Sequence, residues 1–291
     1  MPYKSKRACL MIADGHAHVN PLRGLRAREL AERFLRSGGW FIALVPVSPW
    51  DYGLDITNAE VAYRDVLRYH ESACREVREA GLKVACIAGF HPADVDKLVD
   101  SGLRSSEVLN LGLKVLDYIT SLCRSGRLDG IGEIGRQHYR TIADRVLVSE
   151  LILEEAVLRA QELGCAVHLH LEDVGPETVS LTHRALSRLG IKPSPSTVFH
   201  HAKPSMVREA LSLGYSVTVP GRAAVIAEAV KYGDGFMVES DFPGVELPRA
   251  LRPWDLAAAE EEALRGAPDP ERVLRRINLD AVVRAYGVEP P

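Results

Sequence analysis

The sequence predicts a single (β/α)8 TIM barrel, with residues 1–291 in one domain. Two observations support this fold. Eight short apolar runs each precede a segment with helical periodicity, and side chains that can bind metals follow most of these runs directly. The C-terminal ends of all strands in a barrel open onto one mouth, so only a closed barrel brings these side chains together. A doubly wound open sheet would spread them along an edge.

The apolar runs that we expect to be strands fall at residues 8–13, 40–45, 82–88, 128–133, 165–170, 197–200, 215–219 and 236–238. Their near-continuous apolar character is typical of parallel strands covered by helices. The predicted helices span 24–37, 58–80, 93–100, a segment that begins after 105 or 106, 144–163, 176–189, 205–213, 222–232, 254–265 and 269–286. Asn58 suits an N-cap, and Gly81 and Gly164 suit helix ends.

Composition narrows the class of protein. A chain of 291 residues with 46% hydrophobic residues can bury a large core, and its formal charge of −3 provides no global basic field for wrapping long nucleic acid. The five cysteines include no C-x-x-C pair, so we expect no disulfide framework and a reducing, cytoplasmic environment. The first apolar run is too short for a signal peptide or a membrane span, so we expect no membrane partner.

The first candidate metal ligands are His16 and His18, just beyond the first run. Residues two apart on an extended segment point the same way, so both imidazoles can face one ion. Neutral imidazole is the commonest metal ligand in proteins. The alternative is a turn with two surface histidines, so the metal hypothesis requires further ligands from other strand ends.

Further ligands are available at the ends of later runs. Glu133 lies in Gly-Ile-Gly-Glu-Ile-Gly, and a carboxylate in a barrel mouth needs a cation to offset its desolvation. His170 is nearer the mouth than His168, which we expect to be a hydrogen-bonded core residue. His200 and His201 are adjacent and point to opposite sides, so only one of them can face the barrel axis.

Asp241 is the last candidate carboxylate and follows the eighth run. With the histidines and Glu133 it forms a mixed nitrogen and oxygen set, which suits zinc, manganese or other divalent ions including magnesium. The set is large enough for two ions, with Glu133 as the bridge between them. We therefore expect Glu133 and Asp241 to be catalytic as well, with an ionised Asp241 taking the proton from a metal-activated water.

Six motifs occur in order between about residues 12 and 245: Asp14-x-His-x-His18, Gly89-x-His-Pro92, Ile131-Gly-Glu-Ile-Gly135, His170, a histidine of the sixth run, and Glu239-Ser-Asp-x-Pro243. In these motifs the chain resembles the TatD family of metal-dependent hydrolases, within the amidohydrolase superfamily, as a divergent archaeal-type member. The tail at Asn278 resembles the terminal Asn-containing helix of that family. The resemblance implies a phosphodiesterase of the deoxyribonuclease type, with DNA or an oligonucleotide as substrate. The metal ligands that it implies are His16, His18, Glu133, His170, one of His200 and His201, and Asp241.

The chain departs from the family pattern on the substrate side. The usual Gly-Leu-Asp after the bridging glutamate reads Gly-Arg-Gln, and Glu172 stands where an arginine is usual. The His-Cys-Phe-like segment of the sixth run reads His-His-Ala. Simple alignment places His200 at the ligand position, whereas counting back from the turn at 214–215 favours His201. These departures weaken the nuclease assignment more than the metal site.

For substrate binding we expect His91 and Arg136 to contribute. His91 resembles a phosphate-side or acid-catalysis position of the family, although a structural role in its turn is the alternative. Arg136, Lys203 and Arg222 follow strand ends and are candidates for phosphate contacts, with plain surface charges as the alternative. An aromatic residue of the loop 46–57 is a candidate for stacking on a base.

Two other functions remain open from the sequence. An amidohydrolase or lactonase could use the same metal centre on a C–N or C–O bond. The fourth run carries Glu133 where many such enzymes have a bridging lysine, which favours the phosphoesterase. A non-catalytic barrel that binds RNA or protein would need no stoichiometric metal. The sequence does not indicate an oligomeric state.

Overall fold

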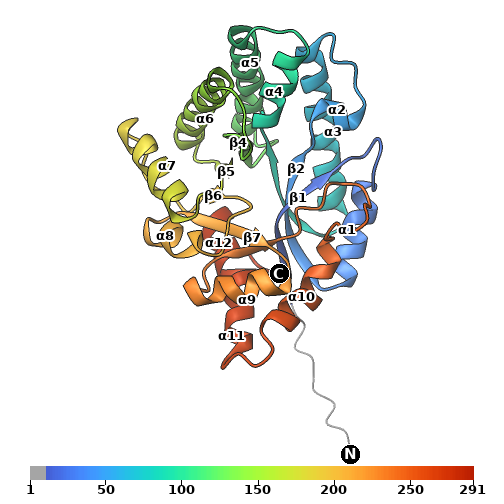
Figure 1. Ribbon diagram of the computed structural model, residues 1–291. Coiled ribbons are helices and arrows are strands. Elements are labelled where there is room, and N and C mark those ends of the chain that lie inside the picture. Colours follow the sequence, from blue (N-terminus) through green and yellow to red (C-terminus); the bar gives the residue numbers. More distant parts are fainter. Residues whose placement is uncertain (1–10) are drawn as a thin grey trace, which may run out of the picture.

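Eight parallel strands follow one another in chain order around a barrel, and helices cover its outside (Figure 1). This is seen in a computed structural model, which describes residues 11–291. The predicted (β/α)8 barrel is therefore confirmed. The beginning of the first predicted strand, residues 8–10, lies outside the described residues.

The strands are β1 (Ile12–Val19), β2 (Gly39–Pro46), β3 (Lys83–Ala88), β4 (Gly130–Gly135), β5 (Ala166–His170), β6 (Thr197–Phe199), β7 (Ser216–Pro220) and β8 (Met237–Glu239). The helices are α1 (Ala27–Arg36), α2 (Pro49–Tyr52), α3 (Ala59–Glu79), α4 (Pro92–Asp100), α5 (Ser105–Arg124), α6 (Ala143–Leu163), α7 (Pro176–Arg188), α8 (Met206–Ser212), α9 (Ala223–Ala229), α10 (Leu256–Ala263), α11 (Pro270–Arg275) and α12 (Ala281–Tyr286). A π-helical turn over Arg276–Asp280 joins the last two helices. The short helix α2 lies in a segment that the sequence predicts to be a loop.

The first strand is longer than the sequence predicts. The apolar run ends at residue 13, but β1 continues to Val19 and pairs with β2 along its length. A bulge between Asp14 and Ala17 shifts the register, so His16 lies in the bulge. The apolar pattern stops early because the polar side chains face the mouth, while the backbone goes on making its ladder.

Two backbone hydrogen bonds draw the two ends of the sheet together. The amide of Asp241 donates to the carbonyl of His16 at 3.0 Å, and the amide of His18 donates to the carbonyl of Phe242 at 2.7 Å. The segment that follows β8 is therefore fixed directly against β1. His16, His18 and Asp241 therefore close the barrel through their backbones, and their side chains are candidate ligands.

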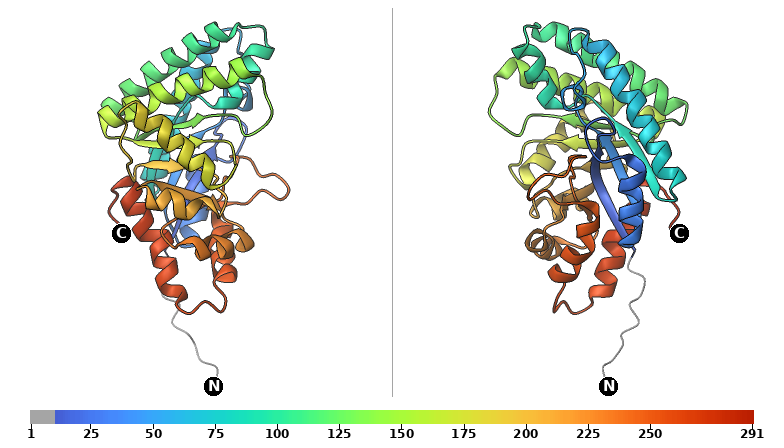
Figure 2. Two further views of the ribbon diagram at one scale, coloured as in Figure 1. Left: turned by 60° about the vertical axis from the view of Figure 1, so that its left-hand side comes forward. Right: turned by 90° about the vertical axis from the view of Figure 1, so that its right-hand side faces the viewer.

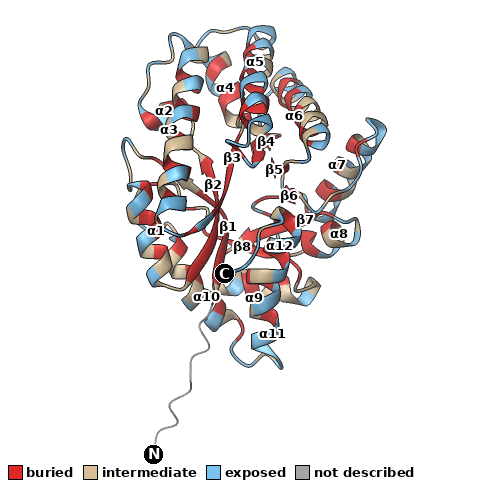
Figure 3. Ribbon diagram, turned by 180° about the vertical axis from the view of Figure 1, so that it is seen from behind, coloured by how far each residue is buried: buried red, intermediate tan, exposed pale blue. Residues whose placement is uncertain are grey.

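The core has two parts. A large apolar layer lies between the strands and the surrounding helices, whose outward faces are exposed (Figure 3). A second cluster includes Phe41, Ile87 and Met237, and Val282 of α12 packs against it. The C-terminal helices lie at one end of the barrel in both further views (Figure 2). Within the described range, no helix combines the length and the apolar character that crossing a membrane would take.

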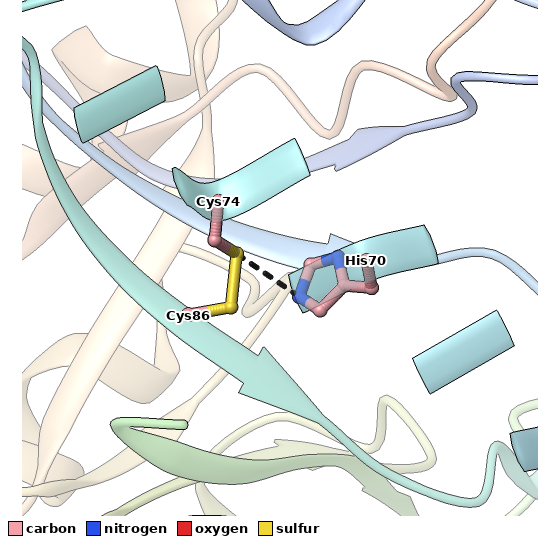
Figure 4. Close-up of side chains that lie close together, drawn as sticks. All are labelled: His70, Cys74 and Cys86. Atoms are coloured by element: carbon pink, nitrogen blue, oxygen red, sulfur yellow. Dashed lines mark hydrogen bonds between the residues drawn. A yellow bond between two sulfur atoms is a disulfide. The ribbon is translucent and has the colours of Figure 1, made fainter. Parts of the chain in front are cut away.

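Cys74 of α3 and Cys86 of β3 form a buried disulfide (Figure 4). The expectation that the cysteines form no disulfide framework was wrong for this pair, because the pairing depends on the packing of α3 against β3 rather than on close spacing. His70, one helical turn before Cys74, places its Nε2 3.5 Å from the Cys74 sulfur. Such a crosslink typically stabilises a fold by about 2–4 kcal/mol, mainly by constraining the unfolded chain.

A buried polar network ties the tail of the chain to the first strand. Asn278 accepts a hydrogen bond from the amide of Ala13 at 2.7 Å and donates one to Glu260 at 2.6 Å. The indole of Trp40 donates to the backbone oxygen of Asn278. Burial raises the pKa of Glu260 to about 8, so its carboxyl group is mostly protonated at neutral pH.

The Glu260→Gln variant tests this protonated carboxyl group. Glutamine keeps an oxygen that accepts from Asn278 but removes the ionisable proton. The folded state of the wild type holds the proton to a higher pH than the unfolded state, whose glutamate pKa is about 4.3. Its free energy of unfolding, measured relative to Glu260→Gln, should therefore fall as the pH rises from about 5 to about 8. Denaturant titrations across this range measure the difference, and the exposed Glu261→Gln on the same helix is the control. A difference that is constant with pH would contradict the prediction.

Candidate metal centre

The carboxylate of Glu133, in the second half of β4, is surrounded by imidazoles. Its Oε1 lies 2.8 Å from His200 Nε2, 3.2 Å from His16 Nε2 and 3.4 Å from His170 Nδ1. Its Oε2 lies 3.5 Å from His91 Nε2. Burial alone would raise the pKa of Glu133, but the surrounding imidazoles, His16 foremost, lower it well below its ordinary value. The strand ends thus place a charged carboxylate at the centre of four histidines.

Two glycines allow this arrangement. A Cβ at Gly132 would collide with His168, and one at Gly135 would collide with the backbone oxygen of His170. Both glycines also have positive φ, at 155° and 151°. Only glycine therefore lets β4 lie this close to β5 and bring Glu133 next to His170.

A second group lies across the junction of β1 and β8. His18 Nε2 is 3.5 Å from Asp241 Oδ1, and His201 Nδ1 is 3.3 Å from Asp241 Oδ2. The backbones of Asp241 and His201 have φ of 48° and 54°, a left-handed conformation that is uncommon outside glycine and that Asp and His adopt more often than most residues. Hydrogen bonds to Asp241 and Glu239 raise the pKa of His201 to about 10. This rim histidine is therefore protonated at neutral pH.

The adjacent histidines of the sixth run have different surroundings. His200 is buried, with Nε2 toward Glu133 and Nδ1 2.8 Å from Glu239 Oε2. His201 is 52% exposed and contacts Glu239 Oε1 at 3.2 Å and Asp241. The prediction that the two side chains point to opposite sides was wrong, because both rings contact the carboxylate of Glu239 near the mouth. The left-handed backbone of His201, with φ of 54°, breaks the alternation of an extended segment on which the prediction depended.

Glu239 is a site residue that the sequence reasoning missed. It is completely buried, and its two oxygens face His200 and His201. Burial alone would raise the pKa of Glu239, but the two imidazoles lower it below its ordinary value. The available signal was an acid at the end of the apolar run 236–238, directly before the Ser-Asp of the last motif.

His138 was also missed, because it lies in the loop after β4 rather than at a strand end. Its Nδ1 is 2.7 Å from His170 Nε2, and its side chain is exposed. His168, by contrast, is the buried core histidine that the sequence predicts. It contacts His16 and Tyr286.

The donor set fits divalent metal ions. His16 Nε2 is buried without a hydrogen-bond partner among the described residues. His18 Nδ1 lies 3.2 Å from the carbonyl of Val45, and His200 Nδ1 faces Glu239, so acceptors hold one nitrogen of each ring. A ring held in this way leaves its other nitrogen free to bind a metal. His16, His18 and Glu133 form one candidate ligand group, and Glu133 with His170 belongs to another.

His91 differs from the other imidazoles around Glu133. Its Nδ1 accepts a hydrogen bond from the amide of Ala93 at 3.1 Å, as the N-cap of α4. Burial lowers the pKa of His91 to about 3, so the ring is neutral and carries its proton on Nε2. That nitrogen is a hydrogen-bond donor into the mouth, because it has no free lone pair for a metal.

Arg136 is engaged away from this centre. Its guanidinium donates to Glu172 at 2.7 and 2.8 Å, to Glu150 at 2.9 Å and to Thr182 at 2.8 Å. Lys203 likewise pairs with Asp173 at 3.3 Å. A contact of Arg136 with substrate stays a prediction, and it would require these bonds to be exchanged.

Two clefts open beside His18. One of about 190 Å³ reaches His91 and Lys97, and one of about 470 Å³ reaches Asp241. The larger cleft is lined by His18, Asn20, Arg23, Val47, Asp51, Asp241, Pro243, Val245 and Leu247. Tyr52 is buried and donates to the carbonyl of Val19, so it is not available to stack on a base.

Comparisons with known proteins place this barrel among hydrolases. A sequence model of the family described as TatD related DNase matches residues 13–287. The uncharacterized protein MJ1127 of Methanocaldococcus jannaschii is 26% identical over 96% of this chain and 97% of that protein.

Solved structures resemble the whole chain. The TatD-like protein AF1765 of Archaeoglobus fulgidus has a TM-score of 0.61 at 20% identity, covering 94% of this chain and 99% of that one. A mutant organophosphorus hydrolase of Deinococcus radiodurans has a TM-score of 0.60 at 15% identity, covering 96% and 93%. At these identities the likeness of the structures concerns the fold.

Replacing Glu239 tests whether this residue orients the ring of His200 for metal binding. Glu239→Ala removes the acceptor that holds His200 Nδ1, so the affinity for Zn²⁺ should fall about 10–100-fold. Glu239→Gln keeps an acceptor oxygen and should lose less. Calorimetric titration of metal-free protein with Zn²⁺ measures both, with the exposed Glu246→Ala as control. Equal affinities of Glu239→Ala and the wild type would show that Glu239 does not orient a ligand.

Proposed function

The chain belongs to the TatD family of metal-dependent hydrolases, and from this premise we propose that it hydrolyses phosphoester bonds at the Glu133 centre. The single observation that supports the proposal most is the convergence of three imidazole nitrogens on one buried oxygen of Glu133. The residues proposed to hold two divalent ions, zinc or manganese, are His16, His18, Glu133, His170, His200 and Asp241. When bound, such ions acidify a water molecule and polarise a phosphoryl oxygen.

Of the adjacent pair, His200 is the proposed ligand. Its Nε2 faces Glu133, while Glu239 holds its other nitrogen. His201 lies at the rim and contacts Asp241, so its proposed role is to exchange protons with solvent. The different roles proposed for His200 and His201 follow from their burial. A metal ligand must face the interior of the mouth, whereas a proton carrier must reach water.

Asp241 is the proposed general base. Burial alone would raise its pKa, but hydrogen bonds to His18 and His201 lower it well below the ordinary value, so the carboxylate is ionised. It is 35% exposed and lies at the edge of the larger cleft, where a substrate can reach it. A proton that Asp241 takes from water can move on to His201 when that ring has released its own proton.

The proposed substrate is a phosphodiester with a limited number of charges, such as a model diester or the end of an oligonucleotide. Arg136 and Lys203 are already paired with carboxylates, and Lys97 lies over the ring of Trp50 at 5.0 Å. Arg23, in the larger cleft, has no ion pair among the described residues. A long duplex would require many phosphate contacts, which this mouth does not offer.

A second candidate is hydrolysis of a lactone or an amide at the same centre. Arg136 and Lys203 are already paired with carboxylates, which favours this candidate. A neutral ester or amide needs no cation besides the metal ions. The apolar side chains of Val245 and Leu247 in the larger cleft also suit a substrate with an apolar substituent.

A substrate panel decides between these candidates. Metal-free and metal-reconstituted protein is assayed with a DNA oligonucleotide, an RNA oligonucleotide, bis(p-nitrophenyl) phosphate, lactones and amides. We expect hydrolysis of phosphodiesters that disappears with chelation and returns with metal. The double variant His16→Ala with Glu133→Ala should lose both bound metal and hydrolysis. Hydrolysis confined to lactones or amides would overturn the phosphoester proposal and leave the metal site in place.

His91 is proposed to donate a hydrogen bond from Nε2 to a substrate oxygen, and a His91→Asn variant tests this role. Asparagine also caps helices well, so the stability of α4 should be kept, but the donor no longer reaches the substrate oxygen. Loss of one such donor typically costs about 10²–10³-fold in kcat. Asn58→Ala is the matched control, because it removes the N-cap of α3 and should lower Tm while kcat stays unchanged. A wild-type kcat for His91→Asn would assign His91 to capping alone.

A further inference from the structure

A chain of contacts leads from the metal centre to the last helix. His16 Nδ1 lies 3.0 Å from His168 Nδ1, and His168 Nε2 lies 2.6 Å from the hydroxyl of Tyr286. The hydroxyl also lies 3.4 Å from the backbone oxygen of Gly15, to which it can donate. Both imidazoles are completely buried, so solvent does not compete for these positions.

A ring that binds a metal through one nitrogen must be neutral, with its single proton on the other nitrogen. The contact of 3.0 Å between the Nδ1 atoms of His16 and His168 likewise requires one donor and one acceptor. A neutral imidazole has one N–H and one acceptor nitrogen. Because Nδ1 faces Nδ1, one ring must donate to the other.

Only one of the two proton arrangements leaves His16 able to bind a metal. If His168 donates, His16 Nδ1 is the acceptor and its proton is on Nε2, toward Glu133. If His16 donates, its Nε2 has a free lone pair. His168 then carries its own proton on Nε2 and needs an acceptor for it, and the hydroxyl oxygen of Tyr286 is in the right place.

We propose that Tyr286 is a positioning residue that sets the metal affinity of the centre by fixing the tautomers of His168 and His16. Its hydroxyl donates to the Gly15 carbonyl and accepts from His168 Nε2, which makes His168 Nδ1 an acceptor and frees His16 Nε2. This inference rests on the proposed metal site. It links α12, which packs against the interior of the barrel, to the chemistry at the mouth.

The isosteric variant Tyr286→Phe removes only the hydroxyl. The dissociation constant for Zn²⁺, measured by calorimetric titration of metal-free protein, should rise about 10–100-fold. Tyr215→Phe is the matched control, because it removes a hydroxyl that lies 3.0 Å from His183 Nδ1, a pair outside the metal centre. It should bind Zn²⁺ as the wild type does. A merely structural role of Tyr286 would lower the Tm of the metal-free protein and leave the Zn²⁺ affinity unchanged.

Substitutions at His168 provide an independent test of the proposed tautomers. In His168→Asn the amide oxygen can occupy the position of Nδ1 and accept from His16 whether or not the hydroxyl is present. Zn²⁺ affinity should therefore stay within a few-fold of the wild type, and adding Tyr286→Phe to this variant should have no further effect. His168→Leu offers no acceptor and should lose about 10–100-fold.

The outcomes separate this inference from the proposed function. If Tyr286→Phe and His168→Leu bind Zn²⁺ as tightly as the wild type, the tautomer control is overturned and the metal site stands. If the wild type binds no Zn²⁺ or Mn²⁺, both proposals are overturned. The inference is supported if Tyr286→Phe binds Zn²⁺ weakly and the combination of Tyr286→Phe with His168→Asn binds it tightly again. Asparagine at position 168 would not rescue a packing defect caused by the loss of the hydroxyl.

Discussion

The burial of the Glu133 carboxylate is the constraint on which the rest of the mouth depends. A charge removed from water is costly unless partners surround it, and here the partners are imidazoles delivered by β1, β5 and β6 and by the turn after β3. Four separate strand ends must therefore meet at one point. A closed parallel barrel achieves this, because every strand ends at the same mouth.

The contacts that close the barrel also hold the two sides of the candidate site together. Backbone hydrogen bonds from Asp241 to His16 and from His18 to Phe242 join the last strand end to the first strand. Ser240 reinforces the junction by donating from both its amide and its side chain to the carboxylate of Asp14. The candidate ligands on either side of this junction are consequently held by backbone as well as by side-chain contacts, which limits the reorganisation that binding an ion would require.

Around the centre, carboxylates and protonated groups are matched so that few cations remain free for a substrate. Arg136 is held by Glu172 and Glu150, although it follows a strand end and would otherwise be well placed for a phosphate. The candidate centre of a metal-dependent hydrolase is thus combined with a mouth that has few unpaired cations. This combination distinguishes the mouth of this chain from a surface adapted to long nucleic acids, which depends on many unpaired lysines and arginines.

The sequence by itself determined the barrel, the order of its elements and most of the candidate residues that the structure brings together around Glu133. Periodicity and the position of polar residues after apolar runs are local properties, so they could be read without a structure. Tertiary structure alone decided which nitrogen of each histidine faces Glu133, that His200 is buried while His201 is at the rim, and that Arg136 is paired. It also decided the positions of Glu239, His138 and Tyr286 beside the candidate ligands or their neighbours, and the disulfide between Cys74 and Cys86. Each of these depends on a contact between segments that are not neighbours in the chain, and no local pattern records such a contact.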